Sequence, residues 1–147
     1  MNRWNEAQKN YFTKQLKDSK KYEKQAAKKV CRRNNDSVDH YCDNYKYDFM
    51  TTNTKLRYEV KHGKASVVYG NFFIECGSDG KPSGILTTEA DFYIIVSNDI
   101  FYLIPTDALK QLIHDKKYIR TASTNITNKT DGFIFNKNTI IKHSVIL

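Results

Sequence analysis

A polar turn between two strand-like segments is the feature that most constrains the fold of this 147-residue chain. Residues 45–50 and 56–62 are expected to form strands, and the polar run 51–54, with the sequence TTNT, is typical of a turn. Successive side chains of a strand point to opposite faces of the sheet. The sequence therefore predicts a β-hairpin, and the position of its turn indicates which charged side chains lie next to each other.

Three charged residues meet in this predicted hairpin. Glu59 and Lys61 share one face of their strand, and Asp48 lies beside Glu59 if the hairpin closes near residues 53 and 54. Two adjacent carboxylates repel each other unless a cation lies between them, and oxygen ligands suit Mg²⁺ or Mn²⁺. A lysine next to such a metal can orient a water or stabilise charge on a phosphate. These residues predict the chemistry of a nuclease.

The rest of the chain predicts an α/β or α+β core, in which one mixed sheet carries helices on its faces. We expect a single domain over 1–147, with a basic helix in 1–33, a candidate catalytic core over 45–105, and a helix and β-rich tail over 106–147. Outside the hairpin we expect a helix over 4–30, a loop over 34–43, strands over 71–76, 91–97 and 100–104, a loop over 77–84, a short helix over 85–90, a helix over 107–116, and strands over 133–135 and 139–141.

Composition narrows the class of protein. No apolar run approaches the length of a membrane span, and the N-terminus is lysine-rich instead of signal-like. The three cysteines are odd in number and show no C-x-x-C spacing, which favours reduced thiols over a disulfide framework or a zinc site. We therefore expect a cytoplasmic protein with no membrane partner.

The positive charge is concentrated at one end of the chain. Residues 1–33 hold 11 Lys and Arg against 3 acidic residues, an excess equal to the net charge of +8 of the whole chain. Such a field attracts polyanions, because neutralising phosphates releases counterions; the alternative is a solvated helix that only maintains solubility. The candidate nucleic-acid-binding residues are Lys14, Lys17, Lys20, Lys21, Lys24 and Lys28.

Glu23 interrupts the apolar stripe of this predicted helix. The stripe includes Phe12, Leu16 and Val30, and helical spacing places Glu23 on the same face. A carboxylate on an apolar face is costly unless something pairs with it. Glu23 can therefore lie at the edge of the stripe, reaching water or a lysine, or it can point at a metal site formed by the sheet.

With these residues in view, the chain resembles the PD-(D/E)XK nuclease superfamily, and most closely its small phage-encoded and Holliday-junction-resolvase-like endonucleases. The resemblance rests on a helix, a strand carrying Asp48, and a strand carrying the Glu-x-Lys motif over 59–61. Two later stretches, 70–75 and 83–93, also look like the region that follows the catalytic strand in phage nucleases of this group.

The resemblance implies a restriction-endonuclease-like core and Mg²⁺- or Mn²⁺-dependent hydrolysis of DNA. It implies that Asp48 and Glu59 are metal ligands, that the main-chain carbonyl of Val60 completes the set, and that Lys61 positions the attacking water or steadies the phosphate. It also matches Glu23 to an acidic residue that resolvase-like members carry on the first helix. A phage origin would place the protein in the host cytoplasm.

Residues after the hairpin leave alternatives open. Glu75 could be a further acid of the site or a partner of Lys61, or an edge-strand acid in solvent. Thr87, Thr88 and Asp91 could contact substrate, or they could cap a short helix and close a strand. Ser83 and the glycine after it lie in a predicted loop that could approach DNA, although a plain turn explains them as well.

Three functions remain in view. The first is a metal-dependent endonuclease acting on branched or replicating phage DNA, as a monomer or as a homodimer. The second is a catalytically inactive member of the same fold that binds nucleic acid or assists phage assembly. The third is a small basic RNA-binding protein whose charged helix is the whole functional surface. Metal binding separates the first from the third, and metal-dependent cleavage separates the first from the second.

Overall fold

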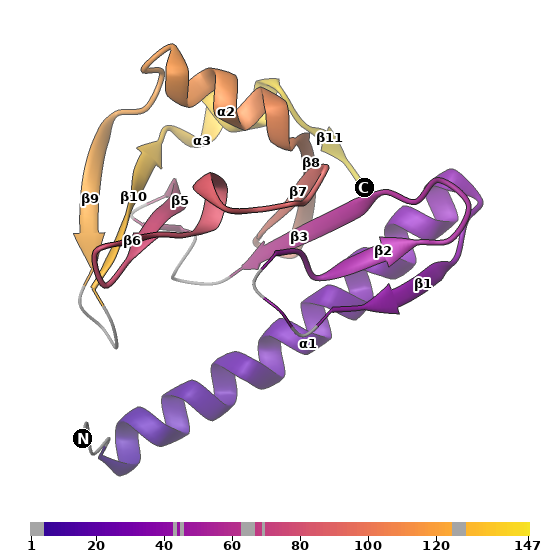
Figure 1. Ribbon diagram of the computed structural model, residues 1–147, viewed down its shortest axis with the longest axis horizontal. Helices are drawn as coiled ribbons and strands as arrows, with labels where there is room; N and C mark the ends of the chain where they lie inside the picture. The colour runs from indigo at the N-terminus through magenta and orange to yellow at the C-terminus, as the bar shows by residue number, and fades with distance from the viewer. Residues whose placement is uncertain (1–4, 43, 45, 63–66, 69, 125–128) are drawn as a thin grey trace.

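The computed structural model describes residues 5–42, 44, 46–62, 67–68, 70–124 and 129–147. It has an α+β fold with two sheets and a long N-terminal helix (Figure 1). The elements in chain order are α1 (Glu6–Asn34), β1 (Val38–Tyr41), β2 (Phe49–Thr51), β3 (Arg57–His62), β4 (Val67–Val68), β5 (Asn71–Ser78), β6 (Lys81–Pro82), the 3-10 helix η1 (Gly84–Leu86), β7 (Phe92–Ser97), β8 (Ile100–Pro105), α2 (Thr106–His114), β9 (Arg120–Thr124), β10 (Thr130–Phe135), α3 (Lys137–Lys142) and β11 (Val145–Ile146).

The first sheet is mixed and has six strands in the order β1-β2-β3-β7-β8-β11. Its β3 and β7 strands are parallel, and its other neighbouring pairs are antiparallel. The second sheet is antiparallel, with the order β4-β5-β10-β9 and with β6 paired to β5. The mixed sheet confirms the expected class, whereas the expectation of one sheet flanked only by helices is wrong.

Helix α1 covers one face of the first sheet with its C-terminal half. Buried Ala26, Ala27 and Val30 pack in one cluster with Tyr58 and Val60 of β3. The helix begins at a capping box, in which Asn5 and Gln8 exchange hydrogen bonds, and ends where Asn35 adopts the left-handed conformation at φ 49°. No helix in the part of the chain that the structure describes is long and apolar enough to span a membrane.

The N-terminal half of α1 extends beyond the sheet (Figure 1). Residues 5–10 are exposed, and Leu16 keeps 49% of its surface exposed. The predicted core stripe is therefore wrong at Leu16, because the sheet is shorter than the helix and covers only its second half. The side chain of Phe12 lies outside the described part of the chain, as does residue 4, where the helix was predicted to begin.

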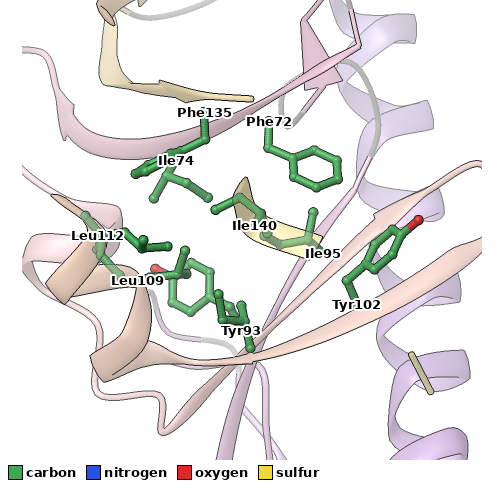
Figure 2. Packing of buried hydrophobic residues seen from close by; sticks show 11 residues of the cluster. Phe72, Ile74, Tyr93, Ile95, Tyr102, Leu109, Leu112, Phe135 and Ile140 are labelled. Atoms are coloured by element: carbon green, nitrogen blue, oxygen red, sulfur yellow. The ribbon is translucent and has the colours of Figure 1, made fainter. Parts of the chain in front are cut away.

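The opposite face of the first sheet packs against the second sheet. Tyr93 and Ile95 of β7 meet Phe72 of β5 and Phe135 of β10 in the larger buried cluster (Figure 2). Leu109 and Leu112 of α2 and Ile140 of α3 complete this cluster. The core therefore lies between the two sheets and beneath α2 and α3.

Several boundaries differ from the sequence prediction. The predicted strand 139–141 is helical, because the Asn136 side chain accepts the N–H of Asn138 and caps α3. Within the predicted loop 34–43, β1 pairs with β2, and the predicted loop 77–84 contains the end of β5 and all of β6.

Three further elements also differ. The helix expected over 85–90 is reduced to η1, β9 was not predicted, and β2 begins at Phe49 instead of residue 45, which lies outside the described residues.

Candidate active site

The β2–β3 hairpin has the register that the sequence predicted. Phe49 pairs with Tyr58 and Met50 with Arg57, so the hairpin closes between residues 53 and 54. The backbone N–H of Asp48 donates to the carbonyl of Tyr58 at 2.8 Å, which extends the pairing by one residue. Asp48 consequently lies next to Glu59.

The carboxyl group of Asp48 is half-buried against β3. Its Oδ2 accepts the backbone N–H of Val60 at 2.6 Å. Burial, the carboxylate of Glu59 and, more weakly, that of Glu23 raise the pKa of Asp48 to about 8, against the opposing effects of the Val60 N–H and Lys61. This part of the hairpin therefore favours an added positive charge, which a proton or a metal cation can supply.

Lys61 forms an ion pair with Glu59 on the same face of β3. Its Nζ lies 3.0 Å from Oε1 of Glu59, and the two side chains keep 33% and 13% of their surface exposed. Burial opposes the charged ammonium, but Glu59, then Tyr93 and Glu75, raise the pKa of Lys61 above its usual range. Lys61 therefore stays protonated and can donate hydrogen bonds to an anion.

These side chains open into a pocket of about 410 Å³ between the two sheets. Glu59 and Lys61 belong to the wall formed by the first sheet, and Glu75 of β5 belongs to the wall formed by the second. The described residues that line the pocket are Asn44, Asp48, Glu59, Lys61, Glu75, Ser78, Lys81, Pro82, Ser83, Gly84, Thr87, Thr88 and Tyr93.

Glu75 is held inside this pocket. Its Oε2 accepts a hydrogen bond from the Ser83 hydroxyl at 2.9 Å, and its charge contributes to the raised pKa of Lys61. Strand β5 lies between β4 and β10, so the alternative of a solvated edge-strand acid is wrong. Glu75 is therefore a half-buried lining residue of the pocket.

Gly84 allows the second wall to close on Glu75. Its φ is +55°, and a Cβ at this position would lie 2.3 Å from the Glu75 carbonyl oxygen. The close approach brings η1 against β5. Thr88 lines the pocket, and its hydroxyl donates to the Lys46 carbonyl at 3.1 Å and accepts the Ala90 N–H instead of capping η1.

Glu23 is half-buried on α1 and does not line the pocket. It lies near enough to Asp48 to contribute to its raised pKa. Helix α1 packs on the Tyr58 and Val60 face of β3, which is opposite to the face of Glu59. Among the described residues, no group of three His, Cys, Asp or Glu side chains could hold a metal ion. The carboxylates that the hairpin brings together are those of Asp48 and Glu59.

Two oxygen ligands of this type nevertheless fit a hard cation such as Mg²⁺ or Mn²⁺, which keeps several waters and takes one or two carboxylates from a protein. The raised pKa of Asp48 is consistent with that fit, because the pair binds positive charge favourably. The donor chemistry of the pocket therefore suits a magnesium-like ion that is partly hydrated.

Sequence reasoning missed much of the second wall. Ser78, Lys81 and Pro82 come from the β5–β6 hairpin, and no local pattern indicates that this hairpin faces β3. Tyr93 offered a weak signal, since it is a polar-tipped residue in the otherwise apolar segment 92–96, and it pairs with Glu59 across the parallel strands.

The six lysines that the sequence singled out on α1 are all exposed. At 100° per residue they fall within an arc of about 120°, on a face distinct from the one that packs on the sheet. These six residues are Lys14, Lys17, Lys20, Lys21, Lys24 and Lys28. They form a continuous basic surface, which we call the lysine face.

Comparison of the chain with protein-family models, with curated proteins and with solved structures found no match.

Proposed function

We propose that this chain is a metal-dependent DNA endonuclease that hydrolyses phosphodiester bonds at the pocket between its sheets. The observation that carries the proposal is the β2–β3 hairpin: its register sets Asp48 beside Glu59, and Lys61 on the same face of β3 lies 3.0 Å from Glu59. Two carboxylates and a lysine on one pocket meet the needs of phosphodiester hydrolysis, which are a metal site and a cationic donor to the phosphate.

In this proposal Asp48 and Glu59 hold Mg²⁺ or Mn²⁺, and the main-chain carbonyl of Val60 is the third candidate ligand. Such an ion would neutralise the anionic phosphate and lower the pKa of a water. Lys61 donates to a phosphate oxygen as negative charge develops there. Glu23 acts from outside the pocket, where its charge strengthens the attraction of Asp48 for a cation.

The fold is compatible with a restriction-endonuclease-like core. The mixed sheet, the long helix on one of its faces and the order helix, Asp-bearing strand and Glu-x-Lys strand all support that assignment. The resemblance predicts a core with one mixed sheet, and the second sheet is an addition to it. The assignment of a restriction-endonuclease-like core therefore rests on the site residues and on the first sheet.

The lysine face would supply sequence-independent attraction to the DNA backbone. The electrostatic attraction of lysines for phosphates brings the substrate to the molecule, and the pocket then selects the bond that is cut. Base recognition is not required for this scheme.

Cleavage assays with Lys61→Ala test the proposal. The substrates are supercoiled plasmid, linear duplex, single strands and a four-way junction. We expect wild-type protein to cut DNA in Mg²⁺ or Mn²⁺ and to lose this activity in EDTA. Loss of a donor to the developing charge lowers the rate by about 10²- to 10³-fold. Lys110→Ala, an exposed lysine of α2, is the matched control and should cut normally. Cutting that survives EDTA, or that Lys61→Ala retains, contradicts the proposal.

A nucleic-acid-binding protein without nuclease activity is the second candidate. The lysine face favours it, because this surface is complete without the pocket. Binding of the same DNAs without cutting, at equal affinity in wild type and Lys61→Ala, would support this function, and tighter binding to RNA would identify the basic RNA-binding alternative.

A further inference from the structure

We infer that the pocket accepts a single unpaired strand of DNA and excludes a continuous duplex. This inference rests on the nuclease function proposed above and names the substrate class of the same site. It follows from the position of the second sheet, which forms the other wall of the pocket of about 410 Å³ that contains the carboxylate pair.

The carboxylate pair lies within this space and not on a convex surface. Glu59 keeps 13% of its side chain exposed, and the opposite wall carries Glu75, Ser83 and Gly84. A phosphate must therefore pass between the two walls to approach Asp48 and Glu59.

The second wall is fastened at several points. The N–H of Ser83 donates to the Cys76 carbonyl at 3.1 Å, in addition to the bond between its hydroxyl and Glu75. The N–H of Glu89 donates to the Lys46 carbonyl at 2.9 Å, which ties the segment after η1 to the chain that enters β2. The Ser83 bonds hold the start of this segment to β5, and the Glu89 bond holds its end to the chain that enters β2, so the segment 83–89 joins the two walls and limits how far they can separate.

The volume of the pocket suits a small part of a nucleic acid. Its 410 Å³ lies near the lower end of the range of small-ligand pockets, roughly 300–1,000 Å³. The phosphates of a duplex lie on the outside of a stiff double helix, on ridges between grooves about 6 and 12 Å wide, so inserting one between two walls would press the neighbouring nucleotides and the opposite strand against them. Extruding a nucleotide costs a few kcal/mol, and least when the strand is already unpaired.

The lining chemistry fits the sugar-phosphate backbone of such a strand. Lys61 and Lys81 supply positive charge, and the hydroxyls of Ser78 and Thr87 supply hydrogen bonds. Tyr93, the aromatic residue among the described lining residues, is 1% exposed and cannot stack on a base. The pocket should therefore select an unpaired strand with little preference for its sequence.

The test uses one end-labelled strand in three forms: alone, annealed to its full complement, and annealed so that a central stretch stays unpaired. In Mg²⁺ we expect wild-type protein to cut the unpaired stretch at least about tenfold faster than the duplex, a difference of about 1.4 kcal/mol in activation free energy. Equal cutting within the full duplex would overturn the inference and leave the nuclease function standing. Failure to cut any form in Mg²⁺ or Mn²⁺ would overturn both.

A pair of variants tests whether the pocket itself selects the strand. Thr87→Trp places a large ring in the pocket and should lower both the cleavage rate of the single strand and the affinity for it. The affinity is measured by fluorescence anisotropy with Ca²⁺ in place of Mg²⁺. Leu86→Trp, at the neighbouring residue with 62% of its surface exposed outside the pocket lining, should leave both unchanged. Thermal unfolding of each variant separates a filled pocket from misfolding, and a folded Thr87→Trp with normal binding and cleavage would overturn the inference.

Discussion

At the residue scale, Asp48 concentrates the electrostatic character of the candidate site. Its hydrogen bond with the Val60 N–H favours the carboxylate, whereas burial and Glu59 favour the protonated acid and dominate. The folded chain therefore binds this proton more tightly than the unfolded chain, in which an aspartate has a pKa near 3.8. Under the proposed function, a divalent cation would compete with this proton for the same carboxylate.

This competition predicts how stability depends on pH. Without a divalent cation, Asp48 contributes stability at low pH that is lost as pH rises from about 4 to about 8, by at most about 1.4 kcal/mol per pH unit. Mg²⁺ should reduce the loss, because it replaces the proton. Thermal unfolding between pH 6 and pH 9, with Mg²⁺ and with EDTA, measures the effect.

Asp48→Asn is the control for this experiment. The asparagine can still accept the Val60 N–H but cannot titrate, so its unfolding temperature should vary less with pH and should not respond to Mg²⁺. Burial lowers the pKa of His62, whose titration affects wild type and variant alike and cancels in their difference. An identical pH dependence in both proteins would contradict the electrostatic account of Asp48.

At the element scale, α1 performs two separate tasks. Its C-terminal half packs on the first sheet through small residues, Ala26 and Ala27, which let the helix approach β3 closely. Its lysine face is solvated along the helix and extends past the sheet. Substitutions on this face should therefore change binding without changing the fold.

Charge reversal tests the lysine face. The double variant Lys17→Glu and Lys24→Glu should bind DNA more weakly, and the slope of log affinity against log salt should fall by about 0.9 for each lost phosphate contact. Lys110→Glu with Lys116→Glu alters the net charge equally at two exposed residues, one in α2 and one in the turn that follows it, and is the matched control. Equal losses in both double variants, measured by anisotropy, would show that only net charge matters.

At the scale of the whole molecule, the cluster between the sheets determines whether the pocket exists. Phe72 and Phe135 from the second sheet pack with Tyr93 and Ile104 from the first, so neither sheet can unfold without exposing the other. We therefore expect one cooperative unfolding transition, with coincident curves from circular dichroism and tyrosine fluorescence.

Phe135→Ala tests this dependence. Phe135 is fully buried, so its truncation should lower the free energy of unfolding by about 3–5 kcal/mol and should weaken cleavage by loosening the second wall. Ile119→Ala, at a residue with 54% of its surface exposed, should change the free energy of unfolding by less than about 0.5 kcal/mol. Urea titration of both variants provides the comparison, and two separate transitions in wild type would contradict the shared core.

Local patterns were sufficient for the hairpin and for the charged triplet on it. Asp48, Glu59 and Lys61 lie within one hairpin, so the period of a strand and the position of one turn predict which of them meet. The lysine face was predicted for the same reason, since helical spacing is also a local property. In both cases the residues that matter are close in the sequence.

The pocket, by contrast, depends on tertiary structure. Glu75 faces Lys61 because β5 belongs to a second sheet, and Thr88 meets Lys46 across 42 residues of chain. Leu16 is exposed because the first sheet ends before the helix does. Such contacts depend on how whole elements pack, and packing is set by shape and burial over the entire core, which no local spacing of residues encodes.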